Sequence, residues 1–393
     1  MNEEKEIKMK ITENIMNVGF ADKDLDIFEG QYPLKDGVTY NSYIILDEKI
    51  AIMDTVDKRA SEEWLANIET ALAGKEPDYL IISHMEPDHS YNIKTLAEKY
   101  PNMKLVSNAK VFAFIPQFFD IKNLAERQIV VGENSTLDLG THQLRFIMAP
   151  MVHWPEVMME YEETEKLLFT ADAFGKFGIV HEIENEETWL DEARRYYINI
   201  VGKYGVQVQA LLKKVASLEI QKICPLHGPV LTENLKFYID KYDTWSKYEP
   251  ESDGVLIACG SMHDFTMEVC TKLEELLKES GKAVKLIDLT RADITEAVGE
   301  AFKYKNLVVA SPTYNAELMP VVEYFLRLLK SKGYQNRRVA YIENGTWAPM
   351  AAKFMMEITS GMKNIENVEP IVTVRTRMNE EVLGKLEELR NHI

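Results

Sequence analysis

Cysteine is scarce in this chain of 393 residues, which contains only Cys224, Cys259 and Cys270. Three cysteines do not make a disulfide framework, so we expect a reducing compartment, the cytoplasm. No uninterrupted apolar run approaches the length that a membrane span requires, and the first residues, MNEEKEIKMK, are charged, unlike a secretory signal. The sequence therefore predicts a cytoplasmic protein that does not cross a membrane.

Positive charge is also in short supply. The chain has 45 Lys and Arg against 63 Asp and Glu, which gives a formal net charge of -18. Partners rich in phosphate are bound by basic faces. This balance argues against nucleic acid and against an anionic membrane surface as partners.

The length of the chain allows two domains, and its character changes near residues 245–254, WSKYEPESDG, a polar stretch with proline and glycine. After this stretch the expected strands and helices alternate, which is typical of βαβ units around a parallel sheet. Residues 251–393 are therefore expected to form a flavodoxin-like, doubly wound parallel sheet. The expected strands are 255–259, 283–289, 307–310, 338–342 and 371–374, and the expected helices are 266–278, 321–329, 350–358 and 380–390.

Residues 1–250 have a different pattern. Residues 41–46 and 49–53 predict a hairpin, and residues 60–73 predict a helix. Several later apolar runs each end in a histidine or an aspartate. We expect this domain to be α/β with mixed or antiparallel sheets.

The hexapeptide His84-Met85-Glu86-Pro87-Asp88-His89 carries four potential metal ligands directly after the apolar run 79–83. Such a run predicts a buried strand, whose end is a rigid platform for a metal site. Without a cation, this many carboxylates and imidazoles in one turn would repel each other and be costly to desolvate. The spacing therefore favours a metal site.

Three more candidate ligands follow later apolar runs: His153, Asp172 and His227. If the four strands end at the same edge of a sheet sandwich, seven ligands converge there. Seven exceed what one tetrahedral zinc ion uses, and they suit two metals with Asp172 as the bridge. Mixed imidazole and carboxylate ligands favour non-haem iron. The remaining histidines without such a context, His142, His181 and His392, are expected to be surface or structural residues.

These motifs resemble a known fold and, within it, a known family. The first domain resembles the metallo-β-lactamase fold, an αββα sandwich, whose hydrolases carry HxHxDH where this chain has Glu86 at the second histidine. With that glutamate, the chain resembles the flavodiiron proteins, which are reductases of dioxygen or nitric oxide. Three further motifs carry the same resemblance: His153-Trp154-Pro155, Asp172-Ala173-Phe174-Gly175 and His227-Gly228-Pro229. The resemblance covers nearly the whole chain, including Thr39-Tyr40-Asn41-Ser42-Tyr43. It implies two iron ions, one bound by His84, Glu86 and His153 and the other by Asp88, His89 and His227, with Asp172 bridging.

Three segments at predicted strand ends could bind FMN, because loop amides and helix N-termini bind the phosphate in this fold. The second and third also offer aromatic rings, Tyr314 and Trp347, for contact with the isoalloxazine ring. The segments are Ser261-Met262-His263-Asp264-Phe265-Thr266, Ser311-Pro312-Thr313-Tyr314-Asn315 and Asn344-Gly345-Thr346-Trp347-Ala348.

The chain departs from the family pattern at two positions. Asp264 stands where a glycine is common, and its carboxylate would repel the phosphate, so we expect it to turn away or to cap the following helix. Glu29 replaces a histidine that many relatives have near the diiron pocket. Either Tyr196 or Tyr197 is expected to line that pocket.

The resemblance implies an oxidoreductase that reduces dioxygen to water, nitric oxide to nitrous oxide, or both. The sequence contains no rubredoxin module with CxxC pairs and no NADH-binding module, so an external donor is expected, by resemblance rubredoxin. The resemblance also implies a head-to-tail homodimer, alone or paired into a tetramer.

Two alternatives use the same motifs. One is a zinc-dependent metallohydrolase fused to a flavodoxin-like domain, against which Glu86 and the flavin segments both count. The other is an electron carrier or gas sensor in which the metal is structural.

Overall fold

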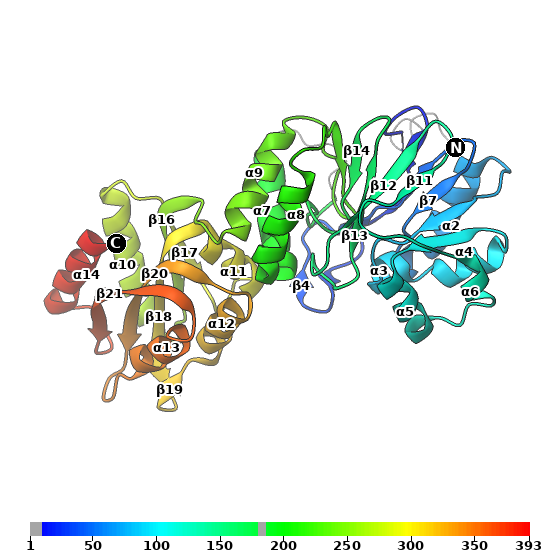
Figure 1. Cartoon of the computed structure of the whole chain (residues 1–393). Coiled ribbons are helices and arrows are strands. Elements are labelled where there is room, and N and C mark those ends of the chain that lie inside the picture. The colour runs from blue at the N-terminus through cyan, green and yellow to red at the C-terminus, as the bar shows by residue number, and fades with distance from the viewer. Residues whose placement is uncertain (1–9, 180–185) are drawn as a thin grey trace. The chain divides into compact units, whose positions relative to one another are not determined.

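The computed structural model describes residues 10–179 and 186–393 (Figure 1). His181 lies outside these residues. The chain divides into two compact units, one of Met1–Tyr197 with Val206–Tyr242 and the other of Ile198–Gly205 with Asp243–Ile393. Among the described residues, no helix combines the length and apolar character needed to cross a membrane.

The first unit contains two mixed sheets, as expected from the sequence. The predicted hairpin is confirmed, since β6 and β7 pair antiparallel. The first sheet has the order β1 (Ile15–Asn17), β6 (Tyr43–Ile45), β7 (Ala51–Met53), β8 (Tyr79–Ile81), β9 (Lys104–Ser107) and β10 (Gln128–Val130). The second has the order β11 (Thr136–Asp138), β12 (Gln143–Met148), β13 (Met158–Glu162), β14 (Leu167–Phe169) and β15 (Lys222–Cys224). Two small ribbons pair β2 (Phe20–Asp22) with β5 (Val38–Tyr40) and β3 (Ile27–Phe28) with β4 (Tyr32–Pro33).

The two sheets of this unit share one hydrophobic core. Ile45 and Ile81 of the first sheet belong to the same buried cluster as Leu144, Phe146 and Phe169 of the second. Helices α2–α6 lie on one side of the strands and α7–α9 on the other, which makes the αββα sandwich (Figure 1). The helices are α2 (Ser61–Leu72), α3 (Pro87–Ser90), α4 (Ile93–Lys99), α5 (Ala109–Phe118), α6 (Leu124–Arg127), α7 (Glu186–Tyr196), α8 (Gly205–Val215) and α9 (Leu235–Ser246).

The second unit is a doubly wound parallel sheet. Its strand order is β17 (Val284–Asp288), β16 (Ser252–Cys259), β18 (Tyr304–Tyr314), β20 (Gln335–Asn344) and β21 (Lys363–Val374), all parallel, with the short β19 (Glu317–Leu318) antiparallel to β18. This is the flavodoxin-like order. The helices are α10 (Phe265–Glu279), α11 (Ile294–Lys303), α12 (Pro320–Ser331), α13 (Ala351–Thr359) and α14 (Glu380–His392).

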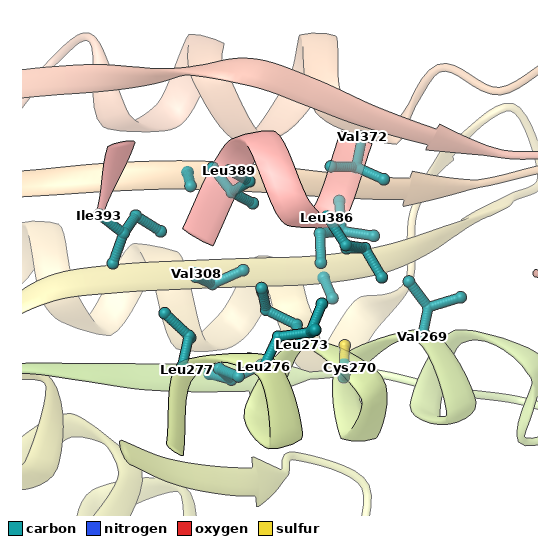
Figure 2. Packing of buried hydrophobic residues seen from close by; sticks show 14 of the residues in the cluster. Val269, Cys270, Leu273, Leu276, Leu277, Val308, Val372, Leu386, Leu389 and Ile393 are labelled. Carbon is teal, nitrogen blue, oxygen red and sulfur yellow. The ribbon is translucent and has the colours of Figure 1, made fainter. Parts of the chain in front are cut away.

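The core of the second unit includes a face on which α10 and α14 pack together. Figure 2 shows Leu273 and Leu277 of α10 and Leu386 and Leu389 of α14 gathered around Val308 of β18. All five side chains are buried. Burying a large apolar side chain stabilises a fold by about 1.5–3 kcal/mol, so these two helices are held by their apolar faces.

Two elements of this unit differ from the expectations. Helix α11 was not predicted; it begins after Asp293, whose carboxylate accepts a hydrogen bond from Thr295 N (2.8 Å). Strand β21 begins at Lys363, earlier than the expected 371, and its residues before 371 are mostly polar and include Pro370. Because β21 is an edge strand, one side of its backbone has no strand partner among the described residues, and both polar residues and proline are tolerated there.

His142 is a structural residue at turns of both sheets in the first unit. Its side chain is only 1% exposed. Its Nδ1 lies 2.8 Å from Asp47 Oδ2, in the β6–β7 turn, and its Nε2 lies 3.4 Å from Glu165 Oε1, in the β13–β14 turn. Burial opposes protonation, but the hydrogen bonds to Asp47 and Glu165 outweigh it and raise the pKa of His142.

The free energy of unfolding should therefore depend on the charge of His142. Because the folded-state pKa is raised, the stabilisation is complete below the unfolded value of about 6.5 and is lost as pH rises through the folded-state value. We expect His142→Phe to lower the free energy of unfolding by about 1.5–3 kcal/mol near pH 6, since it removes hydrogen bonds between charged groups. Chemical denaturation between pH 5.5 and 9 measures the difference, which should shrink as pH rises.

The exposed His392 provides the comparison: its side chain makes one surface hydrogen bond, to the carbonyl oxygen of Glu369, so His392→Phe should lower the free energy of unfolding by less than about 1 kcal/mol. A difference between wild type and His142→Phe that stays constant over this pH range would contradict the charged state of His142.

Candidate metal centre and flavin segments

The structure brings the seven candidate ligands together at one edge of the sandwich. His84 follows β8 of the first sheet, and Asp172 and His227 follow the parallel strands β14 and β15 of the second. Glu86 is the residue before α3, and Asp88 and His89 lie within that helix. His153 lies in the connection between β12 and β13. The carboxyl ends of strands in both sheets thus supply the site.

Four of the ligand atoms form a first group, contributed by His84, Glu86, His153 and Asp172. Glu86 Oε2 lies 3.3 Å from His84 Nε2 and 3.0 Å from His153 Nε2. Asp172 Oδ2 lies 3.2 Å from His84 Nε2 and 3.1 Å from His153 Nε2. Ligand atoms that are about 2.1 Å from one metal and at right angles lie about 3.0 Å apart, so the spacing fits one first-row metal ion.

The second group consists of Asp88, His89 and His227. Asp88 Oδ2 lies 3.3 Å from the Nε2 atom of each histidine, and the two Nε2 atoms are 3.0 Å apart. His227 Nδ1 is 2.7 Å from the carbonyl oxygen of Thr39, so it carries the proton and leaves Nε2 with a lone pair. Imidazole nitrogens facing each other at this distance favour a cation between them.

Asp172 faces both groups. Its Oδ2 belongs to the first group, while its Oδ1 lies 3.2 Å from His89 Nε2 and 3.6 Å from His227 Nε2. The side chain is 1% exposed, and neither Asp172 Oδ1 nor Asp88 Oδ1 has a hydrogen-bond partner among the described residues. Buried carboxylate oxygens without partners are costly, and a bridging position between two cations would satisfy Asp172. The donor set therefore fits two metal ions.

A buried glutamate fixes the orientation of His84. Glu156 Oε1 accepts hydrogen bonds from His84 Nδ1 (2.8 Å) and from Met85 N (3.0 Å). His84 Nε2 is thereby left free to bind a metal, as in other carboxylate–histidine–metal arrangements. Glu156 was not predicted from the sequence; its position directly after the His153-Trp154-Pro155 motif was the available signal.

Two further buried acids hold the end of β8. Asp54 Oδ1 accepts a hydrogen bond from Ser83 N (2.8 Å), and Glu160 accepts one from Ser83 Oγ (3.0 Å). Burial and then the negative charge of Asp54 raise the pKa of Glu160 well above its usual range. Ser83 immediately precedes His84, so these acids position the turn that carries the candidate ligands, and nothing in the local sequence marked them.

Three aromatic rings pack around the imidazole ring of His227. The ring centroids of Phe28, Tyr196 and Tyr40 lie 5.3, 5.6 and 5.8 Å from that of His227. Tyr197 instead packs edge-on against Tyr242, with centroids 4.8 Å apart. Of the two tyrosines left open by the sequence, the geometry therefore favours Tyr196 as the pocket residue.

Glu29 lies at the turn between β3 and β4, next to Phe28. Although its side chain reaches solvent, partial burial and then the charge of Glu86 raise the pKa of Glu29 to about 8, while His153 opposes the shift. Asp88 and Asp172 add to the shift, so Glu29 interacts with members of both groups. Bound cations would lower its pKa, because they favour the carboxylate.

The three candidate flavin segments lie at the carboxyl ends of β16, β18 and β20, which are neighbours in the sheet. In the first, Ser261 Oγ is buried without a hydrogen-bond partner among the described residues, so it is available to a ligand. Asp264 has a left-handed conformation (φ 63°) and does not cap α10 with its side chain. It lines a surface cavity with residues of α10 and Met378, so the capping alternative was wrong.

The second and third segments are partly engaged within the protein. Residues 311–314 continue β18 rather than forming a loop, and Thr313 Oγ1 accepts a hydrogen bond from Met350 N (2.9 Å). Asn344 is the last residue of β20. Tyr314 is 42% and Trp347 is 87% exposed, so both rings are accessible for stacking.

Comparison with known proteins agrees with this architecture. The family described as ODP family beta lactamase matches residues 38–228. An uncharacterized protein of Methanocaldococcus jannaschii is 31% identical over 97% of this chain and 96% of its own length. A nitric oxide reductase of Moorella thermoacetica is 28% identical over 98% of this chain and 97% of its own length.

Two solved structures have the same fold over almost the whole chain. The rubredoxin oxygen:oxidoreductase of Desulfovibrio gigas has a TM-score of 0.90 and 27% identity, covering 98% of this chain and 97% of its own. The flavodiiron protein of Giardia intestinalis has a TM-score of 0.89 and 24% identity, covering 98% and 96%.

Fold and site together define a metallo-β-lactamase-like protein with a candidate dimetal centre, joined to a flavodoxin-like unit. The chain belongs to the flavodiiron protein family.

Proposed function

We propose that this protein is a diiron flavoprotein that reduces dioxygen to water, nitric oxide to nitrous oxide, or both. The observation that carries the proposal is Asp172, whose two carboxylate oxygens face two separate groups of ligand atoms. Mixed imidazole and carboxylate donors favour iron over zinc. The names of the relatives, a nitric oxide reductase and a rubredoxin oxygen:oxidoreductase, support the same reaction class.

The residues that we propose as iron ligands are those of the two groups: His84, Glu86 and His153 for one ion, Asp88, His89 and His227 for the other, and Asp172 for both. When bound, two ferrous ions and reduced FMN supply the four electrons that reduction of dioxygen to two waters requires. Thr39 and Glu156 hold the histidine rings with Nε2 toward the metals. Phe28, Tyr40 and Tyr196 keep water away from one side of the site.

We assign the metal centre to residues 1–250 and the flavin to residues 251–393. The proposed FMN-binding segments are 261–266, 311–315 and 344–348, at three neighbouring strand ends. The unpartnered Ser261 hydroxyl and the exposed rings of Tyr314 and Trp347 support this assignment.

The electron donor that we propose is a rubredoxin-like carrier, in line with the name of the Desulfovibrio gigas relative. Since the flavin segments and the metal groups belong to separate compact units, we propose a head-to-tail homodimer, or a tetramer of two such dimers, as the active form. The three cysteines are free and buried, which supports a reducing, cytoplasmic location.

The test is to purify the full chain without oxygen and to quantify iron, zinc and FMN. We expect two irons and one FMN per chain, and consumption of dioxygen or nitric oxide with reduced rubredoxin as donor. Two zinc ions with no consumption of either gas would overturn the proposal in favour of a metallohydrolase. One turnover or less with excess reduced donor would instead indicate an electron carrier or gas sensor.

A further inference from the structure

The turn between β21 and α14, residues Arg375–Arg377, contains a residue in a strained conformation. Thr376 has φ 69°, in the left-handed region. This region is unfavourable for a β-branched residue and persists only where the surroundings impose it. Such positions concentrate at binding sites, so the contacts of this turn need an explanation.

Contacts to the third flavin segment impose this conformation. The side chain of Asn344 binds both main-chain groups of Thr376: Thr376 N donates to Oδ1 (3.0 Å), and Nδ2 donates to Thr376 O (2.9 Å). The hydroxyl groups of Thr346 and Thr376 are 2.7 Å apart. Asn344 Nδ2 also lies 3.4 Å from Thr266 Oγ1, in the first flavin segment. The turn at 375–377 is therefore tied to two of the three segments.

Positive charge distinguishes this turn from the three segments, which offer a phosphate only amide and hydroxyl groups. Segments 261–266, 311–315 and 344–348 contain no lysine or arginine, and their one formal charge is the negative charge of Asp264. A phosphate monoester carries about -1.5 to -2 charges at neutral pH. The turn provides two guanidinium groups, which bind phosphate in a bidentate manner.

The positions of the two arginines are compatible with phosphate binding. Arg375 Nη1 donates to the carbonyl oxygen of Thr346 (3.4 Å), so its positive charge lies against the third segment. Arg377 is exposed and makes no hydrogen bond or ion pair through its side chain within the described part of the chain. Both side chains can therefore reach a ligand without breaking a buried contact.

We propose that Arg375, Thr376 and Arg377 form a fourth loop of the flavin site, in which the two arginines bind the phosphate of FMN. Thr376 is a positioning residue that holds them beside the third segment. This inference rests on the proposed function, because it assumes that the second unit binds FMN. It adds a source of positive charge that offsets Asp264.

The experiment compares two flavins that differ only in the phosphate. The full-length protein, freed of flavin, is titrated with FMN and with riboflavin, and binding is followed by quenching of flavin fluorescence. For a double variant, Arg375→Gln with Arg377→Gln, we expect FMN affinity to fall at least about tenfold, since charge-assisted hydrogen bonds are lost. Riboflavin affinity should change less than about twofold. Arg327→Gln, an exposed arginine on α12 that pairs with Glu323, is the matched control and should change neither affinity.

The outcomes separate this inference from the proposed function. Failure of the wild-type protein to bind FMN would overturn the proposed function and the inference together. Tight FMN binding by wild type and an unchanged FMN affinity in the double variant would overturn the inference alone. An equal loss of FMN and riboflavin affinity would also overturn it, since the arginines would then not act on the phosphate. Retained riboflavin binding shows that the variant is folded.

Discussion

Asp172→Ala is expected to empty at least one metal position and to lower the reduction of dioxygen or nitric oxide by more than about 100-fold. The reason is geometric: Oδ2 faces His84 and His153, while Oδ1 faces His89. Removing the carboxylate deletes one ligand of the first group and the oxygen that faces His89, and it removes one negative charge that would offset the cations. The measurement is metal content per chain together with gas consumption, and FMN content should be unchanged.

Asp120 provides a matched control, because it is an exposed aspartate that is not among the candidate ligands. Asp120→Ala should keep wild-type iron content and activity. Full iron content in Asp172→Ala would contradict the bridging role. Loss of FMN together with iron would point to unfolding instead, which far-ultraviolet circular dichroism would reveal.

Arg337→Met should strongly destabilise the second unit, lowering the free energy of unfolding by about 4 kcal/mol. The side chain is 2% exposed. Its guanidinium donates to main-chain carbonyl oxygens of Phe302 (2.5 Å), Tyr304 (2.9 Å) and Tyr248 (2.6 Å). Methionine fills a similar volume but removes the donor from two buried acceptors and one partly buried acceptor, and an unsatisfied buried acceptor costs about 1–3 kcal/mol.

Denaturant unfolding followed by circular dichroism measures this loss. Arg327→Met serves as the comparison, since Arg327 is an exposed arginine in an i,i+4 ion pair, which contributes about 0.3–0.5 kcal/mol. Equal unfolding midpoints for the two variants would show that water replaces the lost donor and that the site is less closed than its exposed fraction indicates.

Secondary structure with a clear period could be predicted from the sequence. The hairpin of β6 and β7, helix α2 and the alternating elements of the second unit all follow local patterns of apolar residues. Helix α11 was missed although Asp293 marks its start. The polar half of β21 was missed because its strand conformation comes from pairing with β20, not from its own residues.

In the candidate site, too, some features could be predicted from the sequence and others could not. Histidine and carboxylate residues at strand ends are visible in the chain because their chemistry is local, and the structure brings all seven together. The residues that orient them could not be assigned this role from the sequence, because Asp54, Glu156 and Glu160 acquire it only when the fold buries them beside Ser83 and His84. The choice between Tyr196 and Tyr197 likewise depends on how α7 packs, because neighbouring residues in a helix point about 100° apart.

By itself, the sequence determined the two-part α/β architecture, the types of ligand and the acidic character of the chain. The tertiary structure alone decided which candidate ligand atoms form each group, that Asp172 faces both of them, and that the turn at 375–377 contacts two of the candidate flavin segments. The physical reason is that the types of residue and the spacing of apolar residues can be read from positions that are close together in the chain. Distances between groups far apart in the chain arise only when sheets and helices bury their apolar faces together.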